Sequence, residues 1–313
     1  MERMSTPVRL TIGTRGSHLA RTQTEWVADR VREAYPGALV DIEVIKTQGD
    51  VVLDKPLTTF NDKGLFTREI ETALLEGTLD CAVHSLKDLP AEMPRGLTLA
   101  AIPEREDARD VLITRGHLET GLKPGDAREV LDELREGAVV GTSSLRRTTQ
   151  LLRLRDDLEI EDIRGNVDTR LQKLASGQYD AIVLAAAGLH RIGRADVISA
   201  YFPYRLMLPA PGQGALAIQA RDNDPDALRI LSVLDHWATR QAVTAERAFL
   251  AALGGGCQTP IGCYADVVGH NMEIRGFISE EDGTNSRRDR LNANSNEPVW
   301  AGEKLARKMR PRF

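Results

Sequence analysis

Arginines recur in short turns containing Gly, Ser or Thr in this chain of 313 residues, each close after an aliphatic run. A guanidinium carries a planar fork of donors that binds a carboxylate or a phosphate. Any one of these arginines alone would be interpreted as a solvated or ion-paired surface residue. Their recurrence in one local setting favours an anion-binding site, and separate arginines suit several carboxylates better than one compact phosphate. They are Arg15, Arg146, Arg147, Arg164, Arg170 and Arg191.

Nucleotide-binding and metal-binding motifs are missing from the sequence. No Gly-x-x-x-x-Gly-Lys-Ser/Thr loop is present, and the nearest approach to Gly-x-Gly-x-x-Gly, at Gly212 and Gly214, lacks the third glycine. No group of His, Cys, Asp and Glu has the spacing of metal ligands, so we expect no metal.

Asp88 is the acidic residue best placed for catalysis. It follows a predicted buried strand at 80–84, within His-Ser-Leu-Lys-Asp-Leu-Pro at 84–90. A carboxylate at a strand end can stabilise a developing cation or accept a proton. The structural alternative is a helix N-cap or an ion pair with Lys87. We interpret His84 as a packed or hydrogen-bonded strand residue rather than a base.

Cys257 is the cysteine whose surroundings suit chemistry. It follows three glycines and precedes Gln-Thr-Pro, and glycine-rich loops expose the residues that they carry. An exposed thiol can act as a nucleophile or as an attachment point, although most lone cysteines are buried and inert. The other two cysteines, Cys81 and Cys263, lie in predicted strands, where we expect them to pack. Three cysteines cannot form a disulfide framework.

The elements that must position these residues alternate between strand and helix patterns. Aliphatic runs at 8–12, 39–45 and 80–84 predict strands, and apolar residues near the 3.6-residue period predict helices between them. This order favours an α/β fold with largely parallel sheets, in which ligands bind at the carboxyl ends of strands. Helix N-termini at those ends add N–H donors that favour anions.

An internal repeat relates two parts of the chain. Residues 77–89 align without gaps with 177–189, and Ile-Gly-Thr at 12–14 corresponds to Val-Gly-Thr at 140–142. We interpret the repeat as two similar α/β domains, like those of periplasmic binding proteins, that flank a cleft. The alternative is that two α/β domains are alike in composition alone.

The last part of the chain has another pattern. A predicted helix at 239–253, the glycine-rich loop and short strands indicate a smaller α+β domain. Residues 280–298 are polar and predicted to be mobile, and 301–309 predict a short basic helix. We therefore expect a first domain at 1–104 with 213–236, a second at 105–212 and a third at 237–313.

The composition is that of a soluble globular protein, with 42% apolar and 28% charged residues. The net charge of −5 argues against a general nucleic-acid binder. No apolar run is long enough to span a bilayer, and the N-terminus lacks the pattern of a signal peptide. We expect a cytoplasmic protein that binds neither nucleic acid nor membranes.

Together these motifs resemble the porphobilinogen deaminase, or hydroxymethylbilane synthase, family over about residues 9–277. Each motif is weak alone, but their order is specific. Departures are His18, where proline is common, His190, where lysine or a similar residue is usual, and a poor match from about residue 285. The shared motifs are Gly-Thr-Arg-Gly-Ser at 13–17, Lys-Gly-Leu-Phe at 63–66, Ala-Val-His-Ser-Leu-Lys-Asp-Leu-Pro at 82–90, Gly-Thr-Ser-Ser-Leu-Arg-Arg at 141–147, Arg-Gly-Asn-Val-Asp-Thr-Arg at 164–170, Leu-Pro-Ala-Pro-Gly-Gln-Gly at 208–214 and Gly-Gly-Cys-Gln-Thr-Pro-Ile-Gly at 255–262.

The resemblance implies a transferase of haem biosynthesis that deaminates four porphobilinogen molecules and joins them head to tail into hydroxymethylbilane. It implies a monomer with one dipyrromethane cofactor, bound covalently to Cys257 through a thioether. Asp88 would be the catalytic carboxylate, and Lys63 and Phe66 would adjoin a lid loop. The acetate and propionate groups of cofactor and substrate would be bound by Lys87, Arg15, Ser17, Ser144, Arg146, Arg147, Arg164, Arg170 and Arg191.

A non-enzymatic protein that binds carboxylates or other anions between two domains is the alternative from a different class. Two α/β domains with arginines at their strand ends would fit it. This alternative leaves Cys257 and the third domain without a role.

Overall fold

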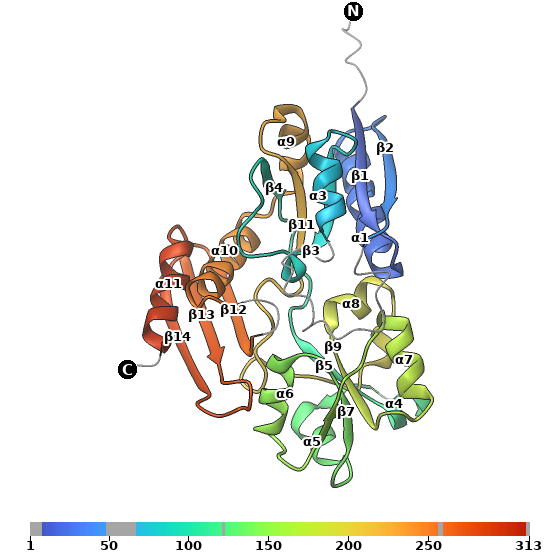
Figure 1. Cartoon of the computed structure of the whole chain (residues 1–313), viewed down its shortest axis with the longest axis vertical. Helices are drawn as coiled ribbons and strands as arrows, with labels where there is room; N and C mark the ends of the chain where they lie inside the picture. Colours follow the sequence, from blue (N-terminus) through green and yellow to red (C-terminus); the bar gives the residue numbers. More distant parts are fainter. Residues whose placement is uncertain (1–7, 48–66, 121–122, 256–258, 311–313) are drawn as a thin grey trace, which may run out of the picture. The chain divides into compact units, whose positions relative to one another are not determined.

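The computed structural model describes residues 8–47, 67–120, 123–255 and 259–310. The chain forms two compact units (Figure 1). The first comprises Met1–Glu104 and Leu216–Trp237, and the second comprises Arg105–Ala215 and Ala238–Phe313. The separate third domain expected at 237–313 stays a prediction, because this division assigns most of these residues to the second unit.

The first unit is built on a five-stranded sheet with the order β2-β1-β3-β11-β4. Strands β1, β2 and β3 are parallel, and β11 is antiparallel to both β3 and β4. The predicted strand at 39–45 is confirmed, whereas the one predicted at 8–12 continues to Arg15 because it pairs with β2 along its whole length. The strands are β1 (Arg9–Arg15), β2 (Leu39–Ile45), β3 (Cys81–Ser85), β4 (Leu97–Ala101) and β11 (Leu216–Arg221).

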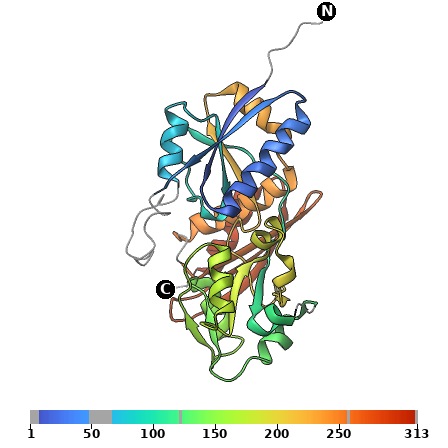
Figure 2. The same ribbon diagram turned by 90° about the vertical axis from the view of Figure 1, so that its right-hand side faces the viewer.

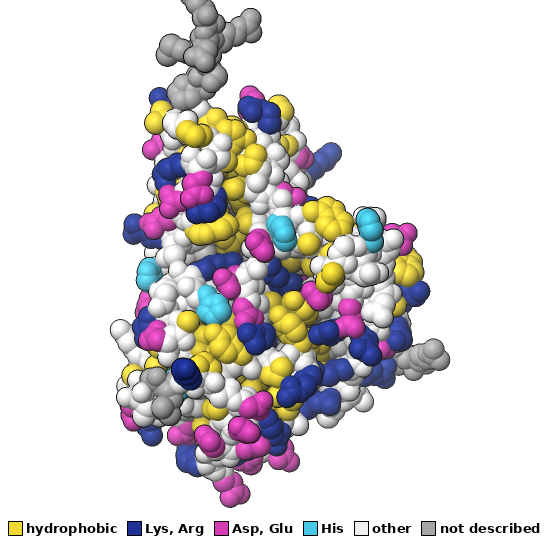
Figure 3. Space-filling view, turned by 180° about the vertical axis from the view of Figure 1, so that it is seen from behind, with side chains coloured by type: hydrophobic (Ala, Val, Ile, Leu, Met, Phe, Trp, Pro, Cys, Tyr) yellow, Lys and Arg dark blue, Asp and Glu magenta, His cyan; other side chains and the backbone are white. Residues whose placement is uncertain are grey.

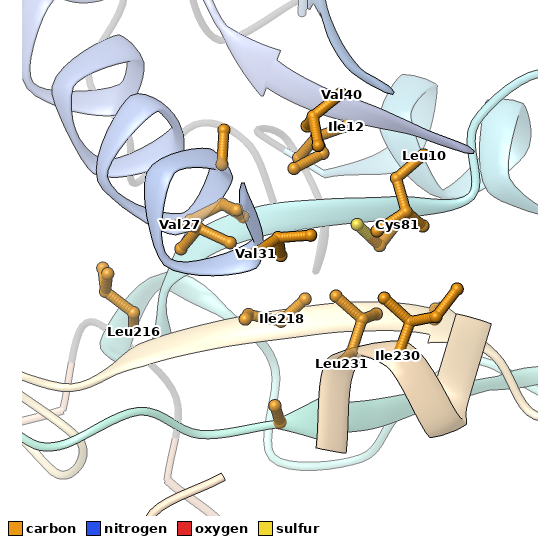
Figure 4. Packing of buried hydrophobic residues seen from close by; sticks show 14 residues of the cluster. Leu10, Ile12, Val27, Val31, Val40, Cys81, Leu216, Ile218, Ile230 and Leu231 are labelled. Carbon is orange, nitrogen blue, oxygen red and sulfur yellow. The ribbon is translucent and has the colours of Figure 1, made fainter. Parts of the chain in front are cut away.

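Helices cover both faces of this sheet (Figure 2). On one face, α1 (His18–Ala34) and α9 (Pro225–Leu231) pack their aliphatic side chains against the strands. Figure 4 shows Val27 and Val31 of α1 above Ile218 of β11. On the other face, α3 (Arg68–Leu75) packs through residues that include Ile70.

The second unit contains a six-stranded sheet with the order β6-β10-β5-β9-β7-β8. Helices α5 (Ala127–Asp132) and α6 (Leu145–Leu152) pack on one face, and α4 (Arg115–Thr120), α7 (Val167–Ala175) and α8 (Ala186–Arg191) pack on the other. The strands are β5 (Asp110–Thr114), β6 (Gly125–Asp126), β7 (Val139–Gly141), β8 (Glu159–Glu161), β9 (Ala181–Ala185) and β10 (Ala200–Tyr201).

The two sheets repeat one arrangement, in agreement with the sequence repeat. In each, three parallel strands are followed by an antiparallel one: β2-β1-β3-β11 corresponds to β8-β7-β9-β5. The corresponding aspartates make the same contact, since Asp80 accepts a hydrogen bond from the Thr11 N–H at 2.7 Å and Asp180 accepts one from the Val139 N–H at 2.9 Å. A likeness of composition alone does not reproduce such a contact.

The C-terminal part of the second unit has its own antiparallel sheet of β12 (Ile261–Val268), β13 (Asn271–Ile278) and β14 (Arg287–Asn294). Helices α10 (Trp237–Ala252) and α11 (Pro298–Met309) pack in the same core. The predicted mobility of 280–298 is wrong for β14, which pairs with β13 along its whole length. Its polar side chains reflect an exposed edge strand rather than an absence of structure.

Two glycines mark places where elements approach closely. A Cβ on Gly13 of β1 would clash with Cδ1 of Leu79, and one on Gly302 of α11 would clash with the carbonyl oxygen of Ala245 on α10. Cys81 and Cys263 are buried, as expected. Within the part of the chain that the structure describes, no helix is both long and apolar enough to cross a membrane.

Candidate functional site

In the first unit, predicted site residues lie at the carboxyl end of two parallel strands. Arg15 ends β1, and Lys87 and Asp88 form part of the 3-10 helix Leu86–Asp88 that directly follows β3. Since β1 and β3 are parallel neighbours, both stretches lie at the same edge of the sheet. Gln23 of α1 links this edge to the helix, because its Nε2 donates to Ser85 Oγ at 3.2 Å.

Ser17 begins the helix that follows Arg15. Its Oγ accepts a hydrogen bond from the Ala20 N–H at 3.3 Å, which makes it the N-cap of α1. The hydroxyl proton is not used in this contact, so Ser17 can also donate to an anion. The positive end of the α1 dipole lies beside it and favours the same kind of ligand.

Asp88 is exposed, and it makes no ion pair with any residue that the structure describes. It is the last residue of its 3-10 helix, whose N-cap is Ser85. Neither structural alternative, a helix N-cap or an ion pair with Lys87, is therefore observed. The carboxylate remains available to a ligand.

His84 lies just before this helix, buried in β3 with 6% of its surface exposed. Its pKa falls from 6.5 to about 4, chiefly because of burial; the side chain of Gln219 opposes this fall, and the charge of Arg15 adds to it. The imidazole is therefore neutral near pH 7. A packed strand histidine, as the sequence predicts, is confirmed.

In the second unit, the turns after β7 and β8 bring another predicted group together. Ser144 precedes α6, and Arg164 lies between β8 and α7. The two turns are joined by Ser143, whose Oγ donates to the Ile163 carbonyl oxygen at 2.9 Å. Arg170, on α7, donates from Nε to the Gly165 carbonyl oxygen at 2.8 Å. These side chains thus lie at one edge of the second sheet, where parallel strands end.

Arg146 and Arg147 are buried and bind the same carboxylate. Arg146 Nη1 lies 2.6 Å from Asp110 Oδ2, and Arg147 Nη2 lies 2.8 Å from Asp110 Oδ1. Burial would raise the pKa of Asp110, but the two arginines outweigh it and hold that pKa well below its usual range. Binding of ligand carboxylates by this pair stays a prediction, since the partner observed is Asp110.

Arg191, the last residue of α8, binds the segment that precedes β11. Its Nη2 donates to the Gly214 carbonyl oxygen at 2.7 Å. Burial lowers its pKa to about 10, opposed by Glu106. The neighbouring His190 contacts Glu106 Oε1 through Nδ1 at 3.1 Å and Tyr201 Oη through Nε2 at 2.9 Å.

Some residues that organise the second unit were not found from the sequence. Asp110 is one, and Gln213 Nε2 also donates to its Oδ1 at 3.0 Å. Arg105 and Glu246 form a second buried pair at 2.6 Å. A usable signal existed for Asp110, since an acid beside the aliphatic run at 111–113 must be paired if it is buried.

Three predicted residues lie outside the described part of the chain. They are Cys257, predicted to hold the cofactor, and Lys63 and Phe66, predicted beside the lid. Their roles stay predictions. Among the described residues, no three His, Cys, Asp or Glu side chains are grouped so that they could hold a metal ion.

Comparisons with known proteins identify the class. The family model for "Porphobilinogen deaminase, dipyromethane cofactor binding domain" matches residues 10–229, and that for "Porphobilinogen deaminase, C-terminal domain" matches 240–311. The chain is thus a transferase that uses a dipyrromethane cofactor. It belongs to the porphobilinogen deaminase family, the hydroxymethylbilane synthases. The C-terminal family model extends to residue 311 and therefore includes most of the stretch from about residue 285 in which we expected a poor match.

Curated relatives support the same assignment over nearly the full length. The porphobilinogen deaminase of Roseiflexus sp. (strain RS-1) is 50% identical over 297 residues, covering 95% of this chain and 94% of the relative. That of Brevibacillus brevis is 51% identical over 274 residues, covering 87% and 85%. That of Synechococcus elongatus is 43% identical over 308 residues, covering 98% and 94%. These matches favour the enzyme over the non-enzymatic anion-binding alternative.

Solved structures are more distantly similar. The BenM effector binding domain with its effector benzoate has a TM-score of 0.42 and 16% identity, covering 80% of this chain and 95% of that one. CbnR, a LysR family transcriptional regulator, has a TM-score of 0.43 and 14% identity, covering 72% and 68%. Similarity at this level carries no argument about function.

Proposed function

We propose that Asp88 is the catalytic carboxylate with which this chain deaminates porphobilinogen and joins four molecules head to tail into hydroxymethylbilane. The observation that carries the proposal is the exposed carboxylate of Asp88 at the carboxyl edge of the first sheet, without an ion pair to a described residue. Departure of ammonia leaves positive charge on the substrate's pyrrole ring, and attack by the next pyrrole creates it again. A fixed carboxylate stabilises both charges and can accept a proton.

The cationic side chains at the two sheet edges would bind the acetate and propionate groups of substrate and cofactor. Each pyrrole unit brings two carboxylates, so several separate guanidinium groups are needed. Arg146 and Arg147 share the single carboxylate of Asp110, which leaves that cluster with an excess of positive charge. This donor set fits a polycarboxylate.

The same residues suit a dipyrromethane, which also carries acetate and propionate groups. Cys257 would hold it through a thioether, and Arg15, Ser17 and Lys87 would bind its carboxylates in the first unit. Ser144, Arg164 and Arg170 would do so in the second. When bound, the dipyrromethane supplies the pyrrole carbon to which the first substrate unit is joined.

Substitution of Asp88 tests the proposal. In a single-turnover assay of ammonia release, Asp88→Asn should lower the rate by about 10²- to 10⁴-fold, because it removes the charge and the proton acceptor. Asp226→Asn is the matched control, since Asp226 is an exposed carboxylate of the same unit in the first turn of α9. Release by folded Asp88→Asn at the wild-type rate would contradict the assigned role.

We also propose that the protein is a monomer in the cytoplasm and that it binds neither nucleic acid nor membranes. The net charge of −5 supports the absence of nucleic-acid binding, and both acidic and basic side chains occur on the face drawn in Figure 3. Light scattering of the purified protein tests the monomer, and a mass of two chains would contradict it.

The domain division proposed is 1–104 with 213–236, 105–212 and 237–313. The separate sheet and core of β12–β14, α10 and α11 support the third domain. Limited proteolysis tests it, with cleavage expected near residue 237 and a protected C-terminal fragment. Digestion that spreads evenly through 237–313 would contradict it.

A further inference from the structure

A row of polar side chains crosses the α3 face of the first sheet. Glu71 lies on α3, Gln219 on β11, His84 on β3 and Arg15 on β1. Gly13 and Gln219 both pair with Ala82, so the side chains at these three positions lie on one face of the sheet. Arg15 and His84 are each two residues further along their strands, so they lie on the same face and at the same level. The row ends at the edge where Lys87 and Asp88 follow β3.

The middle of this row is buried. Gln219 is fully buried, and 6% of His84 is exposed. Gln219 Nε2 donates to Glu71 Oε1 at 3.2 Å, which fixes the amide from one side. The rest of this face is packed with aliphatic residues of α3 and the strands, so core packing alone would be served by an apolar residue at position 84.

His84 and Gln219 have complementary unused groups. Neither Nε2 of His84 nor Oε1 of Gln219 has a hydrogen-bond partner among the described residues. The side chain of Gln219 nevertheless lies close enough to the His84 ring to raise its pKa, against the effect of burial. A neutral imidazole with its proton on Nε2 would donate to that oxygen, and its Nδ1 would then be an acceptor. An acceptor at this position suits the guanidinium of Arg15.

We propose that His84 is a positioning residue: its neutral ring, oriented by Gln219 and Glu71, directs the guanidinium of Arg15 toward a carboxylate of porphobilinogen. The inference rests on the proposed function only in taking Arg15 as a carboxylate-binding residue. His84 itself moves no proton and does not touch the reacting atoms. Its contribution is to binding, so it acts on KM more than on kcat.

Steady-state kinetics of purified, cofactor-loaded variants test this role. His84→Leu keeps the volume but removes both ring nitrogens, and should raise KM for porphobilinogen about tenfold, the scale of one hydrogen bond to a charged group, with kcat within about threefold. His84→Asn retains an acceptor near the Nδ1 position and should restore KM to within about threefold of wild type. If His84→Leu does not fold, Gln219→Leu is the substitute variant, and it should also raise KM.

A double-mutant cycle shows whether His84 acts through Arg15. Arg15→Lys alone should raise KM, and adding His84→Leu should raise it no further, because the group that His84 directs is already altered. His117→Leu is the matched control: His117 is also buried, its Nε2 also lacks a hydrogen-bond partner among the described residues, and it lies in the second unit. It should leave KM unchanged.

The outcomes separate the two hypotheses. If the effects of His84→Leu and Arg15→Lys on KM multiply in the double variant, the positioning role of His84 is overturned. A His84→Leu enzyme with lowered stability and a wild-type KM would overturn it as well. A wild-type KM and full cofactor loading in Arg15→Lys would instead overturn the assignment of Arg15 in the proposed function.

Discussion

Arg105 and Glu246 form a buried ion pair that joins three segments of the second unit. Arg105 Nη1 lies 2.6 Å from Glu246 Oε1, and their side chains are 9% and 0% exposed. The same carboxylate accepts from the Gly212 N–H at 2.6 Å and from the Ala265 N–H at 2.8 Å. The pair therefore connects the segment that enters the unit, the segment that leaves it and β12.

Removing one member of this pair should destabilise the second unit strongly. Glu246→Gln leaves the guanidinium of Arg105 buried without a counter-charge, so we expect a loss of about 3 to 5 kcal/mol in the free energy of unfolding. Urea denaturation measures it. Asp132→Asn, which removes an exposed pair with Arg128, is the control and should cost less than about 1 kcal/mol. A loss of similar size in both variants would contradict the structural role of Glu246.

Asp110 should make stability depend on pH. Its pKa is lower in the folded chain than the usual 3.8, so folding favours the ionised form. Its contribution is complete above about pH 5 and is lost as the pH falls below 3.8. The difference in unfolding free energy between wild type and Asp110→Asn should therefore be large at pH 7 and shrink toward pH 3. If the difference in unfolding free energy between the two proteins does not change with pH, the charge of Asp110 does not contribute to stability.

His84 should make stability depend on pH in a higher range, between pH 7 and pH 5. Its pKa falls from 6.5 to about 4 on folding, so the unfolded chain takes up the proton first as the pH is lowered. Stability should fall by about 1 to 2 kcal/mol between pH 7 and pH 5, by the scale of 1.36 kcal/mol per pKa unit. Urea denaturation of His84→Asn over the same range should show this fall reduced. An equal fall in both proteins would exclude His84 as the group responsible.

Gly302 should be intolerant of a side chain. Its Cβ would meet the Ala245 carbonyl oxygen and the Phe249 nitrogen, which belong to the backbone of α10 and cannot turn away. Gly302→Ala should lower stability by about 1 to 3 kcal/mol through separation of α11 from α10. Gly116→Ala, where nothing lies within 4 Å, is the control and should be neutral or stabilising. Wild-type stability of Gly302→Ala would contradict this packing.

The sequence alone predicts much of the fold because aliphatic runs mark buried strands regardless of context. The strand at 39–45 has the predicted bounds, and the repeated Asp80 and Asp180 occupy corresponding places. Strand β14 is not predicted from the sequence because most of its side chains are polar and exposed, and only Leu291 and Ala293 add apolar contacts to the core.

For the site, the motifs locate the residues but not their partners. Asp88 lies at a strand end as predicted, and the structural alternative, an N-cap or an ion pair with Lys87, is not observed among the described residues. The pairing of Arg146 and Arg147 with Asp110 depends on how β5 and α6 pack together. These residues are separated by more than a strand and a helix in the chain, so no local pattern predicts the contact.

The central claim is that this chain lengthens a pyrrole oligomer that is covalently bound to Cys257, and intact-mass spectrometry tests it directly. The purified protein should exceed the mass of the polypeptide by one dipyrromethane and, on addition of porphobilinogen, gain equal steps of one pyrrole unit. Cys257→Ala should show neither, whereas Cys263→Ala, which alters a buried thiol, should show both. A wild-type mass equal to that of the polypeptide and unchanged by porphobilinogen would contradict the claim.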